Sequence, residues 1–453
     1  MIELDPERIA DSAAAEIVRP GGPGRPDRAE IDSRSSGPGV LFFGLTGGAG
    51  DGGEFAAAAI EAGAWGVVVA PERARELAGA SPEGRDPWVF AAPDPLRALQ
   101  QLAREWRREL AVPVVGITGS VGKTSVKDMT RALLPVRAHA SPENFNTEIG
   151  LPLTILAAPP ETQVLVLEMA MRGSGQIAEL CAIAEPDIAA ITNVGPVHLE
   201  LLGTLEAIAA AKAEILTGLR SGGRAVVPAD AEALAPHLDE ALDTLTFGPG
   251  GEVFARDVSR AEGRTRALIA SPAGEAIFEL PFEESYNLTN AVAAVAIGVA
   301  LGHGTEAMAT RTSGIAFSRL RGELIELPED GIRLINDCYN ANPISMAAAI
   351  DNLAATNAGG RRIGILGGMA ELGPEGPALH RAAAAHARAA GIDVVIGVGE
   401  LARDFAPDDW VAEPEDAVAP VRELSGPGDV ILIKGSRSVG LERFTDAFVA
   451  RGS

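Results

Sequence analysis

The sequence predicts an α/β protein of three domains: a small N-terminal α/β domain, a central parallel-sheet domain of the P-loop type, and a C-terminal Rossmann-like domain. Its 453 residues exceed the roughly 250–300 residues that one hydrophobic core serves. Two separate blocks of continuous β-rich apolar runs alternate with helical segments, a pattern typical of parallel sheets that are buried on both faces. We place the domains at residues 1–109, 110–325 and 326–453.

The N-terminal domain is predicted from two short apolar strands, residues 40–45 and 65–70, on either side of a glycine-rich stretch at residues 47–53. This arrangement indicates a small α/β unit. The chain starts with MIELDPERIADS, which is acidic and has no apolar core. We therefore expect no signal peptide.

The central domain is predicted from strands at residues 114–118, 164–170, 188–194 and 225–227. Shorter alternating segments between residues 252 and 281 indicate an antiparallel appendage. An alanine-rich helix follows from Asn287, and its apolar run at residues 291–301 is too short to span a bilayer.

The third domain follows a connection at residues 321–330. Strands are expected at residues 334–338, 362–366, 394–398 and 430–433, with helices at 343–356 and 377–390. Strands that alternate with helices in this way favour a domain of dinucleotide-fold character.

Composition limits the partners that this protein can have. It contains 62 acidic and 38 basic side chains, a net charge of -24, and such a field repels nucleic acid and anionic membranes. The two cysteines, Cys181 and Cys338, show no paired spacing, which fits a reducing cytoplasm. We expect no nucleic-acid partner and no membrane insertion.

The sharpest motif is Gly116-Ile-Thr-Gly-Ser-Val-Gly-Lys-Thr124, between a predicted strand and a helix at residues 125–134. The strict phosphate-loop pattern has glycine at position 117, whereas here glycine stands one place earlier, at 116. Backbone amides from Gly119 to Gly122 can bind phosphate oxygens, Lys123 can reach the terminal phosphates and Thr124 can hold magnesium. The alternative is a glycine-rich turn that carries an ordinary surface lysine.

Three further candidates lie near the ends of the following strands. Glu168 either points into a ligand crevice or is a solvated strand end, and His198 is either a ligand or a polar loop contact. Thr204 can cap a helix whose apolar face has Lys212 at its middle. That lysine either extends its amine to solvent or is chemically changed.

The whole chain resembles the Mur ligase family, and within it the branch that adds D-alanyl-D-alanine. The motifs that carry the resemblance span all three domains. They are Asp32-Ser-Arg34, Thr118-Gly-Ser-Val-Gly-Lys-Thr124, Asn144-Phe-Asn146, Glu168-Met-Ala-Met, Thr192-Asn-Val-Gly-Pro-Val-His198, Ala211-Lys-Ala-Glu214, Asn287-Leu-Thr-Asn290, Asp337-Cys-Tyr-Asn-Ala-Asn-Pro343, Leu366-Gly-Gly-Met-Ala-Glu-Leu-Gly373 and Lys434-Gly-Ser436. Gly53, Ala170, Tyr286 and Gly368 stand where the family usually has His, Gly, His and Asp.

The resemblance implies a site for ATP and Mg²⁺. It implies that Lys123 and Thr124 hold the terminal phosphates and a first magnesium, while Glu168, His198 and a carbamylated Lys212 organise a second. A carbamate suits this position because an ammonium would be repelled by dications. The other implied nucleotide contacts are Gly119, Ser120, Val121, Gly122, Ser125, Asn287, Asn290, Arg321, Asp337 and Tyr339.

The implied substrates are a UDP-N-acetylmuramoyl-tripeptide and D-alanyl-D-alanine, joined through an acyl phosphate. Candidate substrate contacts are Ser33, Arg34, Asn144, Asn146, Thr147, Asn340 and Asn342. Asn340, Asn342 and Ser345 can equally cap the helix after Pro343. We expect a cytoplasmic monomer. The alternatives are a sister ligase with another amino acid substrate, such as a folylpolyglutamate-type enzyme, and a P-loop nucleotide switch that ligates nothing.

Overall fold

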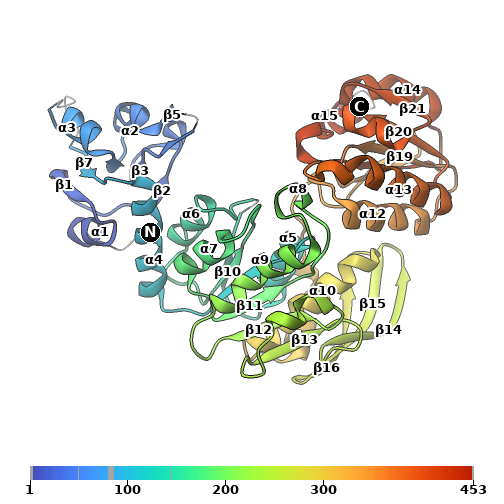
Figure 1. The fold of residues 1–453 in the computed structure, drawn as a ribbon, viewed down its shortest axis with the longest axis horizontal. Helices are drawn as coiled ribbons and strands as arrows, with labels where there is room; N and C mark the ends of the chain where they lie inside the picture. The colour runs from blue at the N-terminus through green and yellow to red at the C-terminus, as the bar shows by residue number, and fades with distance from the viewer. Residues whose placement is uncertain (1–3, 49, 80–85, 143, 451–453) are drawn as a thin grey trace.

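Each of the three predicted regions has its own main sheet in the computed structural model, which describes residues 4–48, 50–79, 86–142 and 144–450. Figure 1 shows the N-terminal region in blue and the C-terminal region in orange and red, each attached to the green and yellow central region. The predicted α/β class with a central parallel sheet is confirmed.

The N-terminal sheet is parallel except at one edge, where β1 runs antiparallel to β7. Its strands, in spatial order, are β1 (Glu16–Arg19), β7 (Trp88–Ala91), β6 (Gly66–Val69), β3 (Val40–Phe43) and β2 (Arg28–Glu30). β3 and β6 are buried along their whole length, which explains why the sequence shows them as continuous apolar runs. Around the sheet lie α1 (Pro6–Ser12), α2 (Ala56–Glu61), α3 (Pro71–Gly79) and the short pair β4 (Thr46–Gly47) and β5 (Gly50–Asp51).

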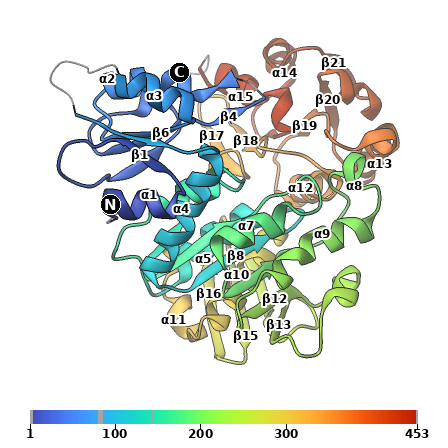
Figure 2. The ribbon, with the colours of Figure 1, turned by 60° about the vertical axis from the view of Figure 1, so that its left-hand side comes forward.

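Helix α4 (Pro95–Leu110) connects this sheet to the central region. Asp94 caps the helix by accepting a hydrogen bond from the Arg97 amide at 3.0 Å. Its buried face packs against α6 (Gly150–Leu156) and α7 (Gln176–Ala184). Figure 2 shows α4 beside α7. Glu185, which follows α7, pairs with Arg104 and Arg108 of α4 at 2.7 and 2.5 Å. Apolar packing and ion pairs therefore both fix α4 to the central region.

All neighbouring strands of the central sheet are parallel. Their order is β13 (Thr244–Phe247), β12 (Arg224–Pro228), β11 (Ile188–Ile191), β8 (Val114–Thr118), β10 (Val164–Glu168) and β9 (Ala138–Ala140). Successive side chains of a strand face opposite sides, so Val114 joins one core and Val115 with Ile117 joins the other. One core contains α6, α7 and α9 (Leu205–Thr217), and the other contains α5 (Lys123–Leu133) and α10 (Ser285–Ala300).

An antiparallel sheet lies beside α10, as predicted for residues 252–281. Its strands are β14 (Phe254–Ala261), β15 (Arg264–Ser271) and β16 (Gly274–Leu280). The alanine-rich run of α10 is buried from Ala291 to Ile297 because small side chains let the helix pack closely against α5. The short α11 (Thr305–Ala309) follows.

The C-terminal sheet combines five parallel strands with one antiparallel edge strand, as far as the described residues show. In spatial order it contains β17 (Glu323–Leu327), β18 (Ile332–Asn336), β22 (Val430–Lys434), β19 (Arg362–Gly367), β20 (Val394–Val398) and β21 (Asp409–Val411). The helices are α12 (Pro343–Ala355), α13 (Gly376–Ala389), α14 (Val418–Leu424) and α15 (Glu442–Ala450). The predicted domain limit at residue 325 falls inside β17, which pairs with β18 of this sheet.

The linker that leads to β17 is anchored to α5. The backbone amide and hydroxyl of Ser318 donate to Asp128 Oδ2 at 3.1 and 2.8 Å. Asp128 also pairs with the buried Lys127 at 3.0 Å, and Lys127 donates to the Ser141 carbonyl at 2.7 Å. The linker is therefore held at a fixed point, with four residues between it and the start of β17.

Two central strands are shorter than the sequence predicts. β10 ends at Glu168 and not at Ala170, and β11 ends at Ile191 and not at Val194. In both places the chain leaves the ladder and its polar groups bond to neighbouring loops. Within the described ranges, no helix combines the length and the apolar character needed to cross a membrane.

Candidate active site

A cavity of about 860 Å³ lies between the central and C-terminal regions. It brings together nearly all of the predicted site residues, although they come from segments far apart in the sequence. Those that line it are Gly119, Ser120, Val121, Gly122, Lys123, Thr124, Ser125, Asn144, Asn146, Thr147, Glu168, His198, Lys212, Asn287, Asn290, Arg321, Asp337, Tyr339, Asn340, Asn342 and Ser345. The two exceptions, Ser33 and Arg34, lie in the N-terminal region.

The loop between β8 and α5 depends on two glycines with left-handed backbone, Gly119 (φ 151°) and Gly122 (φ 79°). A Cβ atom on Gly119 would lie 1.9 Å from the Thr192 hydroxyl oxygen, and one on Gly122 would lie 2.5 Å from Asn290 Oδ1. Side chains therefore do not fit at either position. The first turn of α5 directs its amides and its positive end toward the cavity, which makes it suited to anions.

Asn193 holds this loop, a role that the sequence did not reveal. Its Oδ1 accepts hydrogen bonds from the amides of Ser120 and Val121 at 3.0 and 2.9 Å. The Ser120 hydroxyl donates to the Gly195 carbonyl at 3.0 Å and accepts from the Gly195 amide at 2.9 Å. Two amides that the motif suggests for phosphate binding are thus bonded to Asn193. An asparagine just after a strand carries no signal that separates this role from an ordinary turn.

Glu168 points into the cavity and is not a solvated strand end, because its side chain is only 2% exposed. Its two carboxylate oxygens accept hydrogen bonds from Thr124 Oγ1 at 2.7 Å and from Asn146 Nδ2 at 2.8 Å. Its backbone amide donates to Ser141 Oγ at 3.2 Å. Glu168 therefore lies in direct contact with the threonine at the start of α5.

Lys212 is buried at the middle of α9, as its place on the apolar face predicted. Thr204 caps this helix by accepting a hydrogen bond from the Ala207 amide at 3.2 Å. Burial lowers the pKa of Lys212 far below its ordinary value, and the nearby Lys123 cation lowers it further. A lysine that is 2% exposed does not extend its amine to solvent. Its nitrogen is therefore suited to react as a neutral amine.

Lys123 is held over its own loop. Its amine donates to the carbonyl of Gly119 at 2.8 Å and lies 3.5 Å from that of Ser120. Burial lowers the pKa of this amine, Glu168 raises it and Arg321 lowers it. Electrostatic interactions across the cavity therefore connect Lys123 of the phosphate loop with Glu168 at the end of β10 and Arg321 of the linker.

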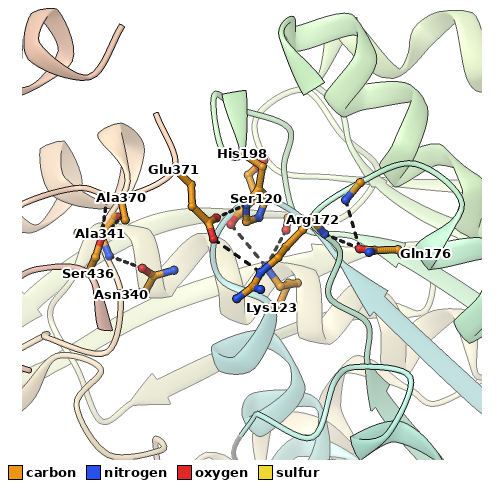
Figure 3. Close-up of polar contacts among 12 residues, drawn as sticks. Ser120, Lys123, Arg172, Gln176, His198, Asn340, Ala341, Ala370, Glu371 and Ser436 are labelled. Carbon is orange, nitrogen blue, oxygen red and sulfur yellow. Dashed lines mark hydrogen bonds and ion pairs between the residues drawn. The ribbon is translucent and has the colours of Figure 1, made fainter. Parts of the chain in front are cut away.

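His198 bonds to a carboxylate of the C-terminal region. Its Nδ1 lies 2.5 Å from Glu371 Oε2, and Arg172 Nε lies 3.6 Å from Glu371 Oε1 (Figure 3). Burial lowers the pKa of His198, Glu371 raises it, and the Lys123 and Lys212 cations lower it again, so that the net shift is downward. Glu371 belongs to the Leu366–Gly373 motif, but nothing in the sequence singles it out from its neighbours there.

The start of α10 and the C-terminal region add flat and polar groups to the lining of the cavity. Asn290 Nδ2 lies 3.3 Å from Asn287 Oδ1. The Arg321 guanidinium stacks over the Tyr339 ring at 4.0 Å from its centroid. Asp337 Oδ2 accepts a hydrogen bond from Lys434 at 2.7 Å. A stacking surface beside a carboxylate and two amides is suited to a base and a ribose.

Asn342 performs the capping role that the sequence left open. Its side chain accepts a hydrogen bond from the Ser345 amide at 3.0 Å, and the Ser345 hydroxyl accepts one from the Asn342 amide at 3.1 Å. This reciprocal pair is a capping box at the start of α12. Asn340 Oδ1 accepts a hydrogen bond from the next amide, at Ala341, at 2.9 Å. Both asparagines still line the cavity.

In the N-terminal region, Arg34 pairs with Asp32 at 2.6 Å, and this bond lowers the pKa of Asp32 to about 2. The glycine at position 53 is covered by Arg73, whose Cγ would lie 3.2 Å from an added Cβ. The Arg73 guanidinium is itself bound to Asp51, Glu54 and Glu76 at 3.2, 3.1 and 2.9 Å. Arg73 thus fills the space beside Gly53.

The donors around the cavity suit magnesium only in part. Within the described residues, no three His, Cys, Asp or Glu side chains gather closely enough to hold a metal ion by themselves. Thr124, Glu168 and His198 offer a hydroxyl, a carboxylate and an imidazole, and phosphate oxygens of a nucleotide would add hard ligands. An unmodified Lys212 ammonium would oppose a cation here, whereas an oxygen-bearing adduct of its amine would complete the set.

Two family models match the chain: the Mur ligase middle domain over residues 117–298, and the Mur ligase glutamate ligase domain over residues 320–437. A UDP-N-acetylmuramoyl-tripeptide--D-alanyl-D-alanine ligase of Bacillus subtilis is 39% identical over 370 residues, which cover 78% of this chain and 79% of that protein. The Escherichia coli protein of the same name is 31% identical and covers 94% of each chain.

Solved structures agree with these sequence matches. MurF from Acinetobacter baumannii superposes with a TM-score of 0.86 at 26% identity over 98% of both chains. The MurF ligase from Thermotoga maritima, solved in complex with ADP, gives a TM-score of 0.81 at 28% identity over 94% of this chain and 97% of that one.

Proposed function

The chain belongs to the Mur ligase family, and from this premise we propose that it is the ATP-dependent ligase that joins D-alanyl-D-alanine to UDP-N-acetylmuramoyl-tripeptide. One observation carries the proposal most directly: a P-loop, buried acidic and lysine side chains and residues of the C-terminal region line a single cavity, in a chain 39% identical to a ligase of that name.

The reaction joins a carboxylate to an amine. A carboxylate oxygen of the tripeptide attacks the γ-phosphorus of ATP, which gives an acyl phosphate and ADP. The amine of D-alanyl-D-alanine then attacks the acyl carbon, the carbon–oxygen bond to phosphate breaks, and the amine loses a proton as the amide forms. Magnesium, when bound, neutralises the charge of the phosphate oxygens.

Among the residues of the phosphate loop, we assign Lys123 to the terminal phosphates and Thr124, with Glu168, His198 and Lys212, to the metal ions. Lys123 lies above the loop carbonyls, from which its charge can turn to a phosphate. The remaining loop residues, Gly119, Ser120, Val121, Gly122 and Ser125, shape the phosphate site.

We propose that Lys212 is carbamylated. Its buried, neutral amine attacks the carbon of CO₂, a nitrogen–carbon bond forms, one carbon–oxygen π bond moves to oxygen, and a proton leaves the nitrogen. The product is an anion with oxygen ligands in place of a cation. Burial, which lowers the pKa of this lysine, supports the chemistry because only the neutral amine reacts.

We assign the adenosine of ATP to the part of the cavity lined by Asn287, Asn290, Arg321, Asp337 and Tyr339. The stacked pair of Arg321 and Tyr339 supplies a flat surface, and Asp337 supplies a carboxylate for ribose hydroxyls. Stacking on the base and binding of the ribose both require the C-terminal region to lie against the central region.

We assign the UDP-muramoyl end of the substrate to Ser33 and Arg34, and its reacting peptide end to Asn144, Asn146 and Thr147. The last three line the cavity beside Glu168. For Asn340 and Asn342 a substrate contact remains a proposal in addition to the capping role that Asn342 performs.

We propose three functional domains, residues 1–109, 110–322 and 323–453. The second limit lies three residues before the sequence-based one because β17 belongs to the C-terminal sheet. We further propose that the enzyme works in the cytoplasm as a monomer; its location is supported by the soluble nucleotides and peptides that we assign as substrates.

A coupled assay of phosphate release tests this function. We expect release only when the UDP-muramoyl tripeptide and D-alanyl-D-alanine are both present with ATP and Mg²⁺, together with an amide product found by mass spectrometry. Replacing the dipeptide by single amino acids or glutamate tests the sister ligases. Hydrolysis that is indifferent to both substrates would favour a nucleotide switch and contradict the proposal.

A further inference from the structure

Glu371 reaches from the C-terminal region to two side chains of the central region. Its Oε2 lies 2.5 Å from His198 Nδ1, and its Oε1 lies 3.6 Å from Arg172 Nε. Figure 3 shows the carboxylate between these two partners, beside the phosphate loop. Both carboxylate oxygens thus face groups of the other domain.

The loop that carries Glu371 is held firmly within its own domain. The Met369 amide donates to His380 Nε2 at 2.8 Å, and the Ala370 amide donates to Ser436 Oγ at 2.8 Å. The Ser436 amide donates to the Gly368 carbonyl at 3.1 Å. These bonds hold the residues that lead directly to Glu371, so its carboxylate moves with the C-terminal domain as one body.

The backbone at both ends of this contact is unusual. Glu371 has a φ of 62° and His198 a φ of 53°, and non-glycine residues rarely adopt this left-handed region. Such conformations persist where the surroundings impose them, and they concentrate at functional sites. The two residues that meet across the domain boundary are therefore both held in a specific orientation.

The bond at Nδ1 decides which nitrogen of His198 stays free for another partner. Because a carboxylate accepts the Nδ1 proton, the lone pair lies on Nε2. A histidine that binds a metal usually donates its other ring N–H to a carboxylate or carbonyl, which fixes the tautomer and the ring orientation. Glu371 is the carboxylate that accepts the Nδ1 proton of His198 in this way.

We propose that Glu371 is a positioning residue: it orients His198 for the metal and makes the metal site of the central domain depend on the docked C-terminal domain. This inference rests on the proposed role of His198 as a ligand. Its rival is a simple ion pair between domains that leaves the metal site unaffected. Replacing Arg172 distinguishes the proposal from this rival, because Arg172 contacts the same carboxylate but not His198.

The test measures binding of Mn²⁺ by electron paramagnetic resonance, with a non-hydrolysable ATP analogue present. We expect Glu371→Ala to weaken Mn²⁺ binding by roughly 10- to 100-fold, at the same site that His198→Ala weakens. Arg172→Ala is the matched control and should stay within about twofold of the wild type, since the median exposed ion pair contributes little. Glu371→Gln should recover part of the affinity because its carbonyl oxygen can still accept the Nδ1 proton.

A double-mutant cycle shows whether Glu371 acts through His198. In a His198→Ala background, Glu371→Ala should have no further effect on Mn²⁺ affinity. Independent, additive effects would overturn the inference, and so would wild-type affinity in Glu371→Ala or equal losses in Glu371→Ala and Arg172→Ala. Circular dichroism of each variant establishes that it is folded.

The proposed function is judged separately. Phosphate release that requires both substrates supports the ligase whatever the Mn²⁺ titrations show. If that requirement holds while Glu371→Ala binds Mn²⁺ normally, the inference fails and the function stands. If neither substrate is required, the function fails, whereas the Mn²⁺ titrations still decide the role of Glu371.

Discussion

At the scale of single residues, Lys123 and Lys127 lie one turn apart on α5, and their replacement by alanine should affect different properties. The Lys123 variant should lose turnover, and the Lys127 variant should lose stability. Lys123→Ala removes the charge that we assign to the terminal phosphates, and we expect kcat to fall by about 100- to 1,000-fold with an unchanged melting temperature. Lys127→Ala breaks a buried pair with Asp128, whose members are 2% and 8% exposed. It should lower the free energy of unfolding by about 3–5 kcal/mol.

Steady-state turnover and urea denaturation of the two variants measure these effects side by side. Near wild-type turnover in folded Lys123→Ala would remove this lysine from the site. A fully stable Lys127→Ala would mean that the buried pair and its link to Ser141 contribute no net stability.

Lys212 allows chemical rescue. If it acts as a carbamate, Lys212→Ala should lose activity and recover part of it in acetate, whose carboxylate can fill the vacated space. Lys212→Arg should remain inactive because a guanidinium keeps its charge and cannot become a carboxylate. Turnover at increasing acetate is the measurement, with sodium chloride of equal ionic strength as the control. Full activity of either variant without acetate would contradict the carbamate.

Site residues can be predicted from the sequence where their chemistry conflicts with their surroundings. Lys212 lies on an apolar helix face and Glu168 ends an apolar strand, so the residue pattern marks both as unusual, although it leaves their roles open. Asn193 and Glu371 have no such contrast. Both are polar residues in loops, and their importance comes from contacts with segments 73 and 173 residues away. Local patterns do not encode such distances.

At the scale of elements, the attachment of α4 should be sensitive to acid. The hydrogen bond from Arg108, with further support from Arg104, lowers the pKa of Glu185 to about 2 in the folded protein, against about 4.3 when unfolded. The ion pairs therefore stabilise the fold above about pH 4.3, and this contribution is lost as the pH falls toward 2.

Urea denaturation at successive pH values tests the predicted loss of stability at low pH. Between about pH 4.5 and 2.5, the unfolding free energy of the wild type should fall more steeply than that of Glu185→Gln, which lacks the titrating group. Equal pH dependence of the unfolding free energy in both proteins would mean that protonation of Glu185 does not weaken the attachment of α4.

Elements with a strong period or a continuous apolar run were predicted well, and edge elements were not. The buried strands β8 and β19 match the expected ranges to within a residue. The edge strand β13 has only alternate residues buried and β21 has none fully buried, so neither has a comparable continuous apolar signal. The Thr204 cap was predicted correctly, and for Asn342 the capping alternative is the one that the structure shows.

At the scale of the whole molecule, ligands should draw the domains together. The groups that we assign to the nucleotide lie on both the central and C-terminal domains, and the proposed acyl phosphate must be kept from water. Small-angle scattering with an ATP analogue and the tripeptide should therefore give a smaller radius of gyration than the free protein. The same radius under saturating ligands would count against closure, and ADP alone provides the comparison.

Domain number and class followed from length and strand pattern, but the arrangement of the domains did not. That arrangement depends on side chains that meet across boundaries, such as Ile344, whose Cδ1 would lie 1.9 Å from a Cβ on Gly195. Neither residue is unusual in its own segment. Only the folded chain shows that these two residues meet.

The anchor of the linker at Ser318 sets the effective concentration of the C-terminal domain around the central domain. Only four residues separate this fixed point from β17, so the C-terminal domain behaves as a tethered ligand of the central domain. Short flexible tethers give local concentrations on the order of millimolar, which fall with about the −3/2 power of tether length. A tether ten times longer would lower that concentration by roughly 30-fold. The contacts of Glu371 with His198 and Arg172 can therefore each be weak and still act together, because the linker already keeps the two domains near each other.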